Sequence, residues 1–169
     1  MRQVFITGLI SIIFCSCGQK NDNKSAFGTS QYTGQYDLGG DIEKGRIGSV
    51  TVYSETDNTI LFFLNVNRGA PSYNMGQLYG RISIENNKGS FNEKILDYYN
   101  GCKLRFEFKE EILTIEYINE QDRDCGFGFA VWASGDYRRQ NKLQPEFFQD
   151  QMGDTVYFAK TTPEKYNEE

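Results

Sequence analysis

Apolar and polar residues alternate along much of the chain, which is typical of β-strands that bury one face. The clearest run covers residues 104–108, where apolar residues alternate with charged ones, and residues 113–117 repeat it after a short polar connection. These two runs predict a hairpin. Residues 60–66 are apolar at nearly every position. They predict a central strand that is covered on both faces.

Four more runs alternate in the same way, and Gly, Asn, Asp and Pro residues separate them, as in β-turns. These runs are residues 50–53, 78–84, 127–131 and 154–160. Near the C-terminus, Pro145 and Glu146 resemble the first turn of a helix, because proline fits there and an acid suits the helix dipole. They predict a short helix that carries Phe147, Phe148 and Met152.

The pattern as a whole predicts an all-β fold, a single antiparallel domain of about eight to ten strands with one short C-terminal helix. A β-sandwich and a closed β-barrel both suit it. Residues 30–160 would form this domain, and residues 161–169 would form a charged, frayed tail.

The first residues have the pattern of an export signal. Arg2 precedes the apolar residues 4–14, a run too short to cross a bilayer, which takes about 20 residues. Ser16 and Cys17 then resemble a bacterial lipobox. The resemblance implies that residues 1–16 are a signal peptide and that Cys17 is lipidated. Two alternatives stay open: modification of Cys15, and an ordinary secretory signal.

The next segment, residues 17–29, is small and polar and predicts a flexible tether between the lipid and the domain. The membrane is therefore an expected partner through the anchor. Residues 19–23 resemble the signal that sends some Bacteroidetes lipoproteins to the cell surface. We expect a chain in the bacterial cell envelope, on the outer membrane, at its periplasmic face or at the cell surface.

Two cysteines remain in the expected domain, Cys102 and Cys125. Exported proteins meet an oxidising compartment, so we expect a disulfide between them, which would stabilise the fold by roughly 3 kcal/mol. Two buried free thiols are the alternative. Two cysteines without histidine do not easily complete a tetrahedral metal site, so neither metal nor cofactor is expected.

Composition narrows the function. The 169 residues include 18 basic and 23 acidic side chains, a net charge of −5, which argues against nucleic acid as a partner. The chain contains no histidine, which excludes Ser-His-Asp and Cys-His catalysis. We therefore expect a binding module, not an enzyme.

Acidic residues gather between residues 107 and 124, and two carboxylates can hydrolyse a glycosidic bond. Because most lie at polar strand positions or in turns, a solvated face is the favoured interpretation. The acids are Glu107, Glu110, Glu111, Glu116, Glu120, Asp122 and Asp124. The polar residues 68–76 are a further candidate for a binding loop, with an ordinary loop as the alternative.

Ser134, Gly135 and Tyr137 resemble the Ser-Gly-x-Tyr loop of the periplasmic inhibitors of i-type and g-type lysozymes. The resemblance extends over residues 102–139. It implies an exported, disulfide-bearing antiparallel β domain whose loop enters the lysozyme cleft, where the Ser134 and Tyr137 hydroxyls bond near the catalytic acids. Arg138 adds a cationic donor that complements such acids. An ordinary structural turn also explains the motif.

The favoured hypothesis is a non-catalytic lipoprotein that presents loops to a partner, and lysozyme inhibition is its most specific form. One alternative is a carrier of a small apolar or sugar ligand inside a barrel, in a cavity lined by Phe62, Phe106 and Phe129. The other is a hydrolase that uses two of the acids.

Overall fold

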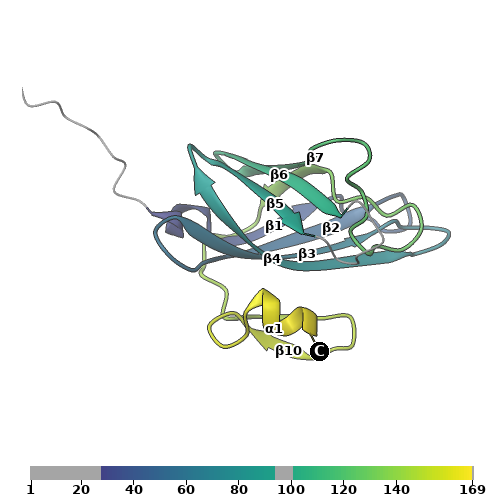
Figure 1. Cartoon of the computed structure of the whole chain (residues 1–169). Helices are drawn as coiled ribbons and strands as arrows, with labels where there is room; N and C mark the ends of the chain where they lie inside the picture. Colours follow the sequence, from purple (N-terminus) through teal and green to yellow (C-terminus); the bar gives the residue numbers. More distant parts are fainter. Residues whose placement is uncertain (1–27, 94–100, 169) are drawn as a thin grey trace, which may run out of the picture.

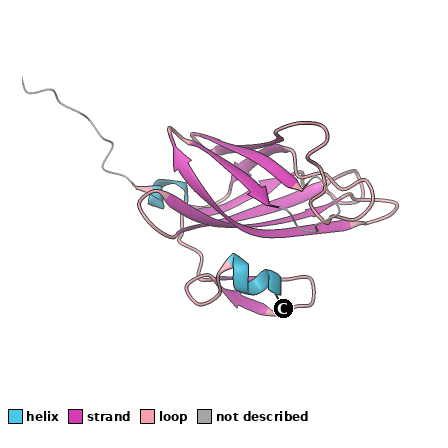
Figure 2. Cartoon of the chain, in the orientation of Figure 1, coloured by secondary structure: helices cyan, strands magenta, loops and turns pink. Residues whose placement is uncertain are grey.

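The structure, a computed structural model, describes residues 28–93 and 101–168. The expected signal peptide (1–16), Cys17 and most of the expected tether lie outside these residues. The described chain folds into an eight-stranded antiparallel barrel followed by a small C-terminal segment (Figures 1 and 2). The all-β prediction is confirmed.

Each strand of the barrel pairs with the next one along the chain, and β8 closes the barrel on β1. Closure places Tyr36 opposite Arg139 and Asp37 opposite Arg138, so the fold is a barrel and not a sandwich. The elements before and within the barrel are η1 (Thr29–Tyr32), β1 (Gly34–Leu38), β2 (Ile47–Ser54), β3 (Thr59–Asn67), β4 (Met75–Glu85), β5 (Lys88–Glu93), β6 (Cys102–Lys109), β7 (Ile112–Tyr117) and β8 (Gly135–Arg139). The C-terminal segment holds β9 (Phe147–Gln149), β10 (Thr155–Tyr157) and α1 (Pro163–Glu168).

Aromatic side chains fill the barrel interior. Phe62 is fully buried, and its ring centroid lies 4.7 Å from that of Phe106 and 5.4 Å from that of Phe91. Phe129, by contrast, is 83% exposed. The predicted lining of an internal ligand cavity is therefore wrong, because two of its rings pack on each other and the third lies on the surface.

The outer face of β3 and β4 is also apolar, and the C-terminal segment covers it (Figure 1). The ring of Phe148 stacks on Phe63 with centroids 3.8 Å apart and also contacts Tyr79. Val156 and Phe158 complete this second cluster. The prediction that residues 60–66 are covered on both faces is confirmed.

The helix predicted from Pro145 and Glu146 is wrong. Phe148 faces the barrel there while its neighbours Phe147 and Gln149 are exposed, an alternation that pairs β9 with β10 instead of coiling into a helix. Packing on the barrel thus overrides the local helix signal. The short C-terminal helix is α1, within the stretch expected to be frayed, where Tyr166 contacts Phe148.

A second correction concerns residues 127–131, which were expected to form a strand. They lie in the connection between β7 and β8, outside any strand. Among the described residues, no helix has the length and apolar character needed to cross a bilayer.

Candidate functional site

The two ends of the barrel carry different connections (Figure 1). At one end, short turns at residues 55–58, 86–87 and 110–111 join successive strands. The other, which we call the loop end, carries the longer connections 39–46, 68–74 and 118–134. Because binding residues in β proteins concentrate on loops held by a rigid scaffold, the loop end is the candidate site.

Side-chain hydrogen bonds join the three loops to one another. The Tyr73 hydroxyl donates to the Glu43 carboxylate at 2.7 and 2.8 Å, a contact that raises the pKa of Tyr73. The Asn74 amide donates to the carbonyl of Phe129 at 2.8 Å. These contacts order the loops before any partner arrives, which lowers the entropy lost on binding.

Loop 118–134 is also fixed to the barrel. The Cys102–Cys125 disulfide is present and joins the loop to the start of β6, as predicted. Further along, the backbone N–H of Ala133 donates to the Tyr117 hydroxyl at 3.0 Å. The loop is therefore held at its middle and at its end.

A buried carboxylate secures the first part of the same loop. Asp122 is 3% exposed, and its carboxylate accepts hydrogen bonds from Lys103 at 2.8 Å and from Asn119 at 2.7 Å. The hydrogen bond from Lys103 is the main cause that lowers the pKa of Asp122. The side chain is therefore a structural anchor of the loop.

Aromatic and arginine side chains gather on the outside of the loop end. Phe129 is 83% and Trp132 39% exposed. The Arg123 guanidinium lies 4.9 Å from the Trp132 ring, and that of Arg68 lies 6.0 Å from the Phe129 ring. Trp and Arg are the residue types that dominate binding energy at protein interfaces, and the stacked rings keep the arginines in place.

The sequence motif at residues 134–138 is mainly structural. Tyr137 is fully buried in the barrel core, where burial raises the pKa of its hydroxyl, and that hydroxyl donates to the Ala133 carbonyl at 2.7 Å. Gly135 has φ +155, a conformation that L side chains rarely adopt. The expectation that Tyr137 contacts a partner is therefore wrong, because its ring is inaccessible. Ser134 is half-buried and Arg138 exposed.

The clustered acids are largely occupied by basic partners. The Glu107 carboxylate lies 2.9 Å from Lys109, and that of Glu111 lies 2.6 Å from Lys142. Hydrogen bonds from these lysines lower the pKa of both acids. A carboxyl that acts as a general acid needs a raised pKa, so these contacts do not favour the hydrolase alternative.

Within residues 28–93 and 101–168, no three Cys, Asp or Glu residues are grouped closely enough to hold a metal ion.

Comparison of the chain with protein-family models, with curated proteins and with solved structures finds no match. The loop at residues 68–76 was a candidate for partner binding from its composition. Phe129 was expected only inside the barrel, as part of a ligand cavity, and Trp132 was not a candidate. Their only signal was that Phe129 lies in an apolar alternation next to glycines, which also fits a buried strand.

Proposed function

We propose that the protein is a lipid-anchored binding module of the bacterial cell envelope, which holds a partner macromolecule at the loop end and catalyses no reaction. The observation that carries this proposal is the exposed pair Phe129 and Trp132, flanked by Arg68 and Arg123, on loops that are tied together. A rigid aromatic surface of this kind resembles the hot spots of protein interfaces.

The position of η1, the first element that the structure describes, supports an orientation of such a module. The Thr29 hydroxyl hydrogen-bonds to the Ser54 hydroxyl and to the backbone carbonyls of Thr56, in the 55–58 turn, and Thr59, just after it. Helix η1 therefore lies at the short-turn end (Figure 1). A tether from Cys17 would enter the fold there. The loop end would then point away from the membrane and toward a partner.

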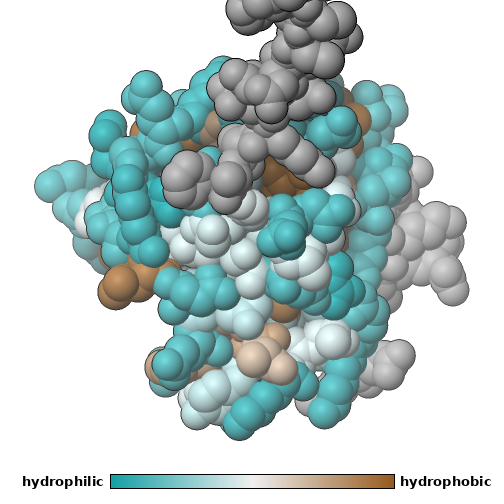
Figure 3. Space-filling view, turned by 90° about the vertical axis from the view of Figure 1, so that its left-hand side faces the viewer, coloured by the Kyte–Doolittle hydropathy of each residue, from teal (hydrophilic) through white to brown (hydrophobic). Residues whose placement is uncertain are grey.

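The surface of the short-turn end has the character expected of a side that binds no partner. Its described residues are mainly hydrophilic, and hydrophobic residues occupy only small separate areas (Figure 3). Small scattered apolar areas are ordinary on soluble protein surfaces and need no binding partner.

Lysozyme inhibition remains one partner-specific form of the proposal. It would now rest on the loop end and on the half-buried Ser134. It would not rest on Tyr137, or on Arg138, which pairs with Ile112 directly after the short turn 110–111 and so lies toward the short-turn end. A lysozyme is therefore the first partner to be offered to the protein.

Site-specific photocrosslinking in the living bacterium tests the proposal. A photoreactive amino acid replaces Phe129 in one variant and Met152 in another. These residues have similar exposure, 83% and 86%, and Met152 lies in the turn between β9 and β10, outside the loops 39–46, 68–74 and 118–134. We expect a defined crosslinked band from position 129 that is absent from position 152. The same bands at both positions, or none at 129, would overturn the proposal.

A further inference from the structure

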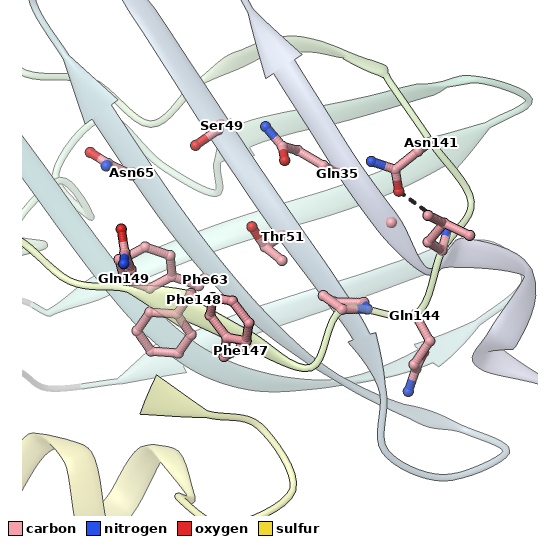
Figure 4. A pocket seen from close by; sticks show the side chains of 13 residues that line it. Gln35, Ser49, Thr51, Phe63, Asn65, Asn141, Gln144, Phe147, Phe148 and Gln149 are labelled. Atoms are coloured by element: carbon pink, nitrogen blue, oxygen red, sulfur yellow. Dashed lines mark hydrogen bonds between the residues drawn. The ribbon is translucent and has the colours of Figure 1, made fainter. Parts of the chain in front are cut away.

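A groove runs along the outside of the barrel, between strands β1–β3 and the chain from Asn141 to Gln149 (Figure 4). Its volume is about 710 Å³. Sites for small molecules usually enclose roughly 300–1,000 Å³. The groove is separate from the loop end and takes no part in the proposal above.

The groove has no charged side chain in its lining. None of its 13 lining residues is Asp, Glu, Lys or Arg, although 24% of the chain is charged. A charged ligand would lose its hydration there without meeting a counter-charge, which is costly. The lining therefore selects against nucleotides, phosphorylated headgroups and acidic peptides.

Amide and hydroxyl groups lie in two rows on the floor of the groove. Gln35 pairs in register with Thr51, and Ser49 pairs with Asn65 on the neighbouring strand. Gln149 faces them from the C-terminal segment (Figure 4).

Most of these polar groups are available to a ligand. Within the described part of the chain, the side chains of Ser49, Thr51, Asn65 and Gln149 make no hydrogen bond to another protein group, whereas Gln144 is bonded twice to the backbone of Ser54. Hydroxyl and amide side chains both donate and accept hydrogen bonds. They match a ligand whose hydroxyl groups also do both.

An apolar surface adjoins the polar rows. The Phe147 ring is 47% exposed and lines the groove, as do Phe63 and Phe148, which are stacked on each other. A wholly apolar ligand would cover the amides and leave them unpaired, at a cost of roughly 1–3 kcal/mol each. The ligand must therefore combine hydroxyl groups with one apolar face.

We propose that this groove binds an uncharged saccharide, with sugar hydroxyls bonded to Ser49, Thr51, Asn65 and Gln149 and the C–H face of a ring packed on Phe147. An extended peptide fits less well. Peptides often bind by adding a strand to a free sheet edge. In the closed barrel every strand from β1 to β8 already pairs on both sides, and β9, which lines the groove and pairs only with β10, offers an edge of just three residues.

The test uses the full-length chain in a detergent that lacks a sugar headgroup. The probes are an array of neutral oligosaccharides, built from hexoses, pentoses and N-acetylhexosamines, and a matched array of acidic ones; titration calorimetry follows on each bound glycan. Asn65→Asp keeps the shape of the side chain but replaces the amide donor with a carboxylate. Asn92→Asp makes the same change at an exposed site on β5, outside the groove.

We expect a neutral glycan to bind, at least tenfold weaker binding by Asn65→Asp, and unchanged binding by Asn92→Asp. Thr51→Val, which removes one hydroxyl without adding charge, should weaken binding as well. Failure of every neutral glycan to bind, selective binding of acidic glycans, or full affinity in Asn65→Asp and Thr51→Val would overturn the proposal. None of these results bears on crosslinking at position 129, so the two proposals fail separately.

Discussion

The Tyr137 hydroxyl donates a hydrogen bond of 2.7 Å to the backbone carbonyl of Ala133, inside the barrel. Tyr36 on the neighbouring strand β1 does the same to the carbonyl of Tyr32 at 2.8 Å, and burial raises the pKa of Tyr36 to about 12. Each hydrogen bond joins a tyrosine on a barrel strand to a backbone carbonyl four residues earlier, just before that strand begins. Together they hold both sides of the seam at which β8 closes on β1.

Removing the Tyr137 hydroxyl should destabilise the fold without touching the binding surface. We expect Tyr137→Phe to lower the free energy of unfolding by about 1–2 kcal/mol, because the buried Ala133 carbonyl loses its donor. Urea denaturation measures the change. Tyr157→Phe, at a residue that is 42% exposed, is the control and should stay within about 0.5 kcal/mol. An equal loss in both variants would contradict a specific role for the Tyr137 hydroxyl.

The C-terminal segment should contribute to the stability of the barrel through Phe148. Its ring is 5% exposed and stacks on Phe63, so Phe148→Ala should cost about 3–5 kcal/mol. The adjacent Phe147 is 47% exposed, and Phe147→Ala should cost about 1 kcal/mol. Thermal and urea unfolding of the two variants compare them directly. Similar small losses would mean that the segment is not part of the cooperative fold.

Acid should weaken the fold through Asp122. The ordinary pKa of this carboxyl is 3.8, and folding lowers it. The ionised carboxylate therefore stabilises the protein at pH values above 3.8, and this contribution is lost as the pH falls through the lower pKa of the folded state. The free energy of unfolding should therefore fall between about pH 5 and about pH 2, and less steeply in Asp122→Asn. Glu120→Gln, an exposed change in the same loop, should keep the slope of the parent. This account would be contradicted if the free energy of unfolding of Asp122→Asn fell with pH as steeply as that of the parent.

The proposed anchor can be tested at the two neighbouring cysteines. Cys17→Ser should move the protein from the membrane fraction to the soluble fraction, because its thiol would carry the lipid. Cys15→Ser should leave the protein on the membrane. Cell fractionation and immunoblotting measure both. The reverse result would assign the lipid to Cys15, and a membrane location in both variants would argue against an anchor on either residue alone.

Period-two alternation in the sequence predicted the strands that bury one face and the doubly covered residues 60–66. It could not show that β8 pairs with β1, because that contact joins strands about a hundred residues apart. It also misplaced the helix, because the contact of Phe148 with the distant Phe63 and the pairing of β9 with β10 both favour extended residues 147–149.

The candidate site was harder to predict. Tyr137 lies two residues after Gly135, a spacing that equally fits an inward position on a strand and a loop contact. Phe129 lies in an alternation that suggests burial, yet its loop turns it outward. Side-chain exposure in loops depends on contacts such as that between Asn74 and the Phe129 carbonyl, which no local pattern encodes.

The affinity of the crosslinked partner for Phe129→Ala and for Met152→Ala tests the central claim most directly. Both substitutions remove a strongly exposed apolar side chain, so both proteins should keep the stability of the parent. We predict binding at least about tenfold weaker for Phe129→Ala, which corresponds to about 1.4 kcal/mol, and unchanged binding for Met152→Ala. Parental affinity in Phe129→Ala, or an equal loss in both variants, would contradict a binding site at the loop end.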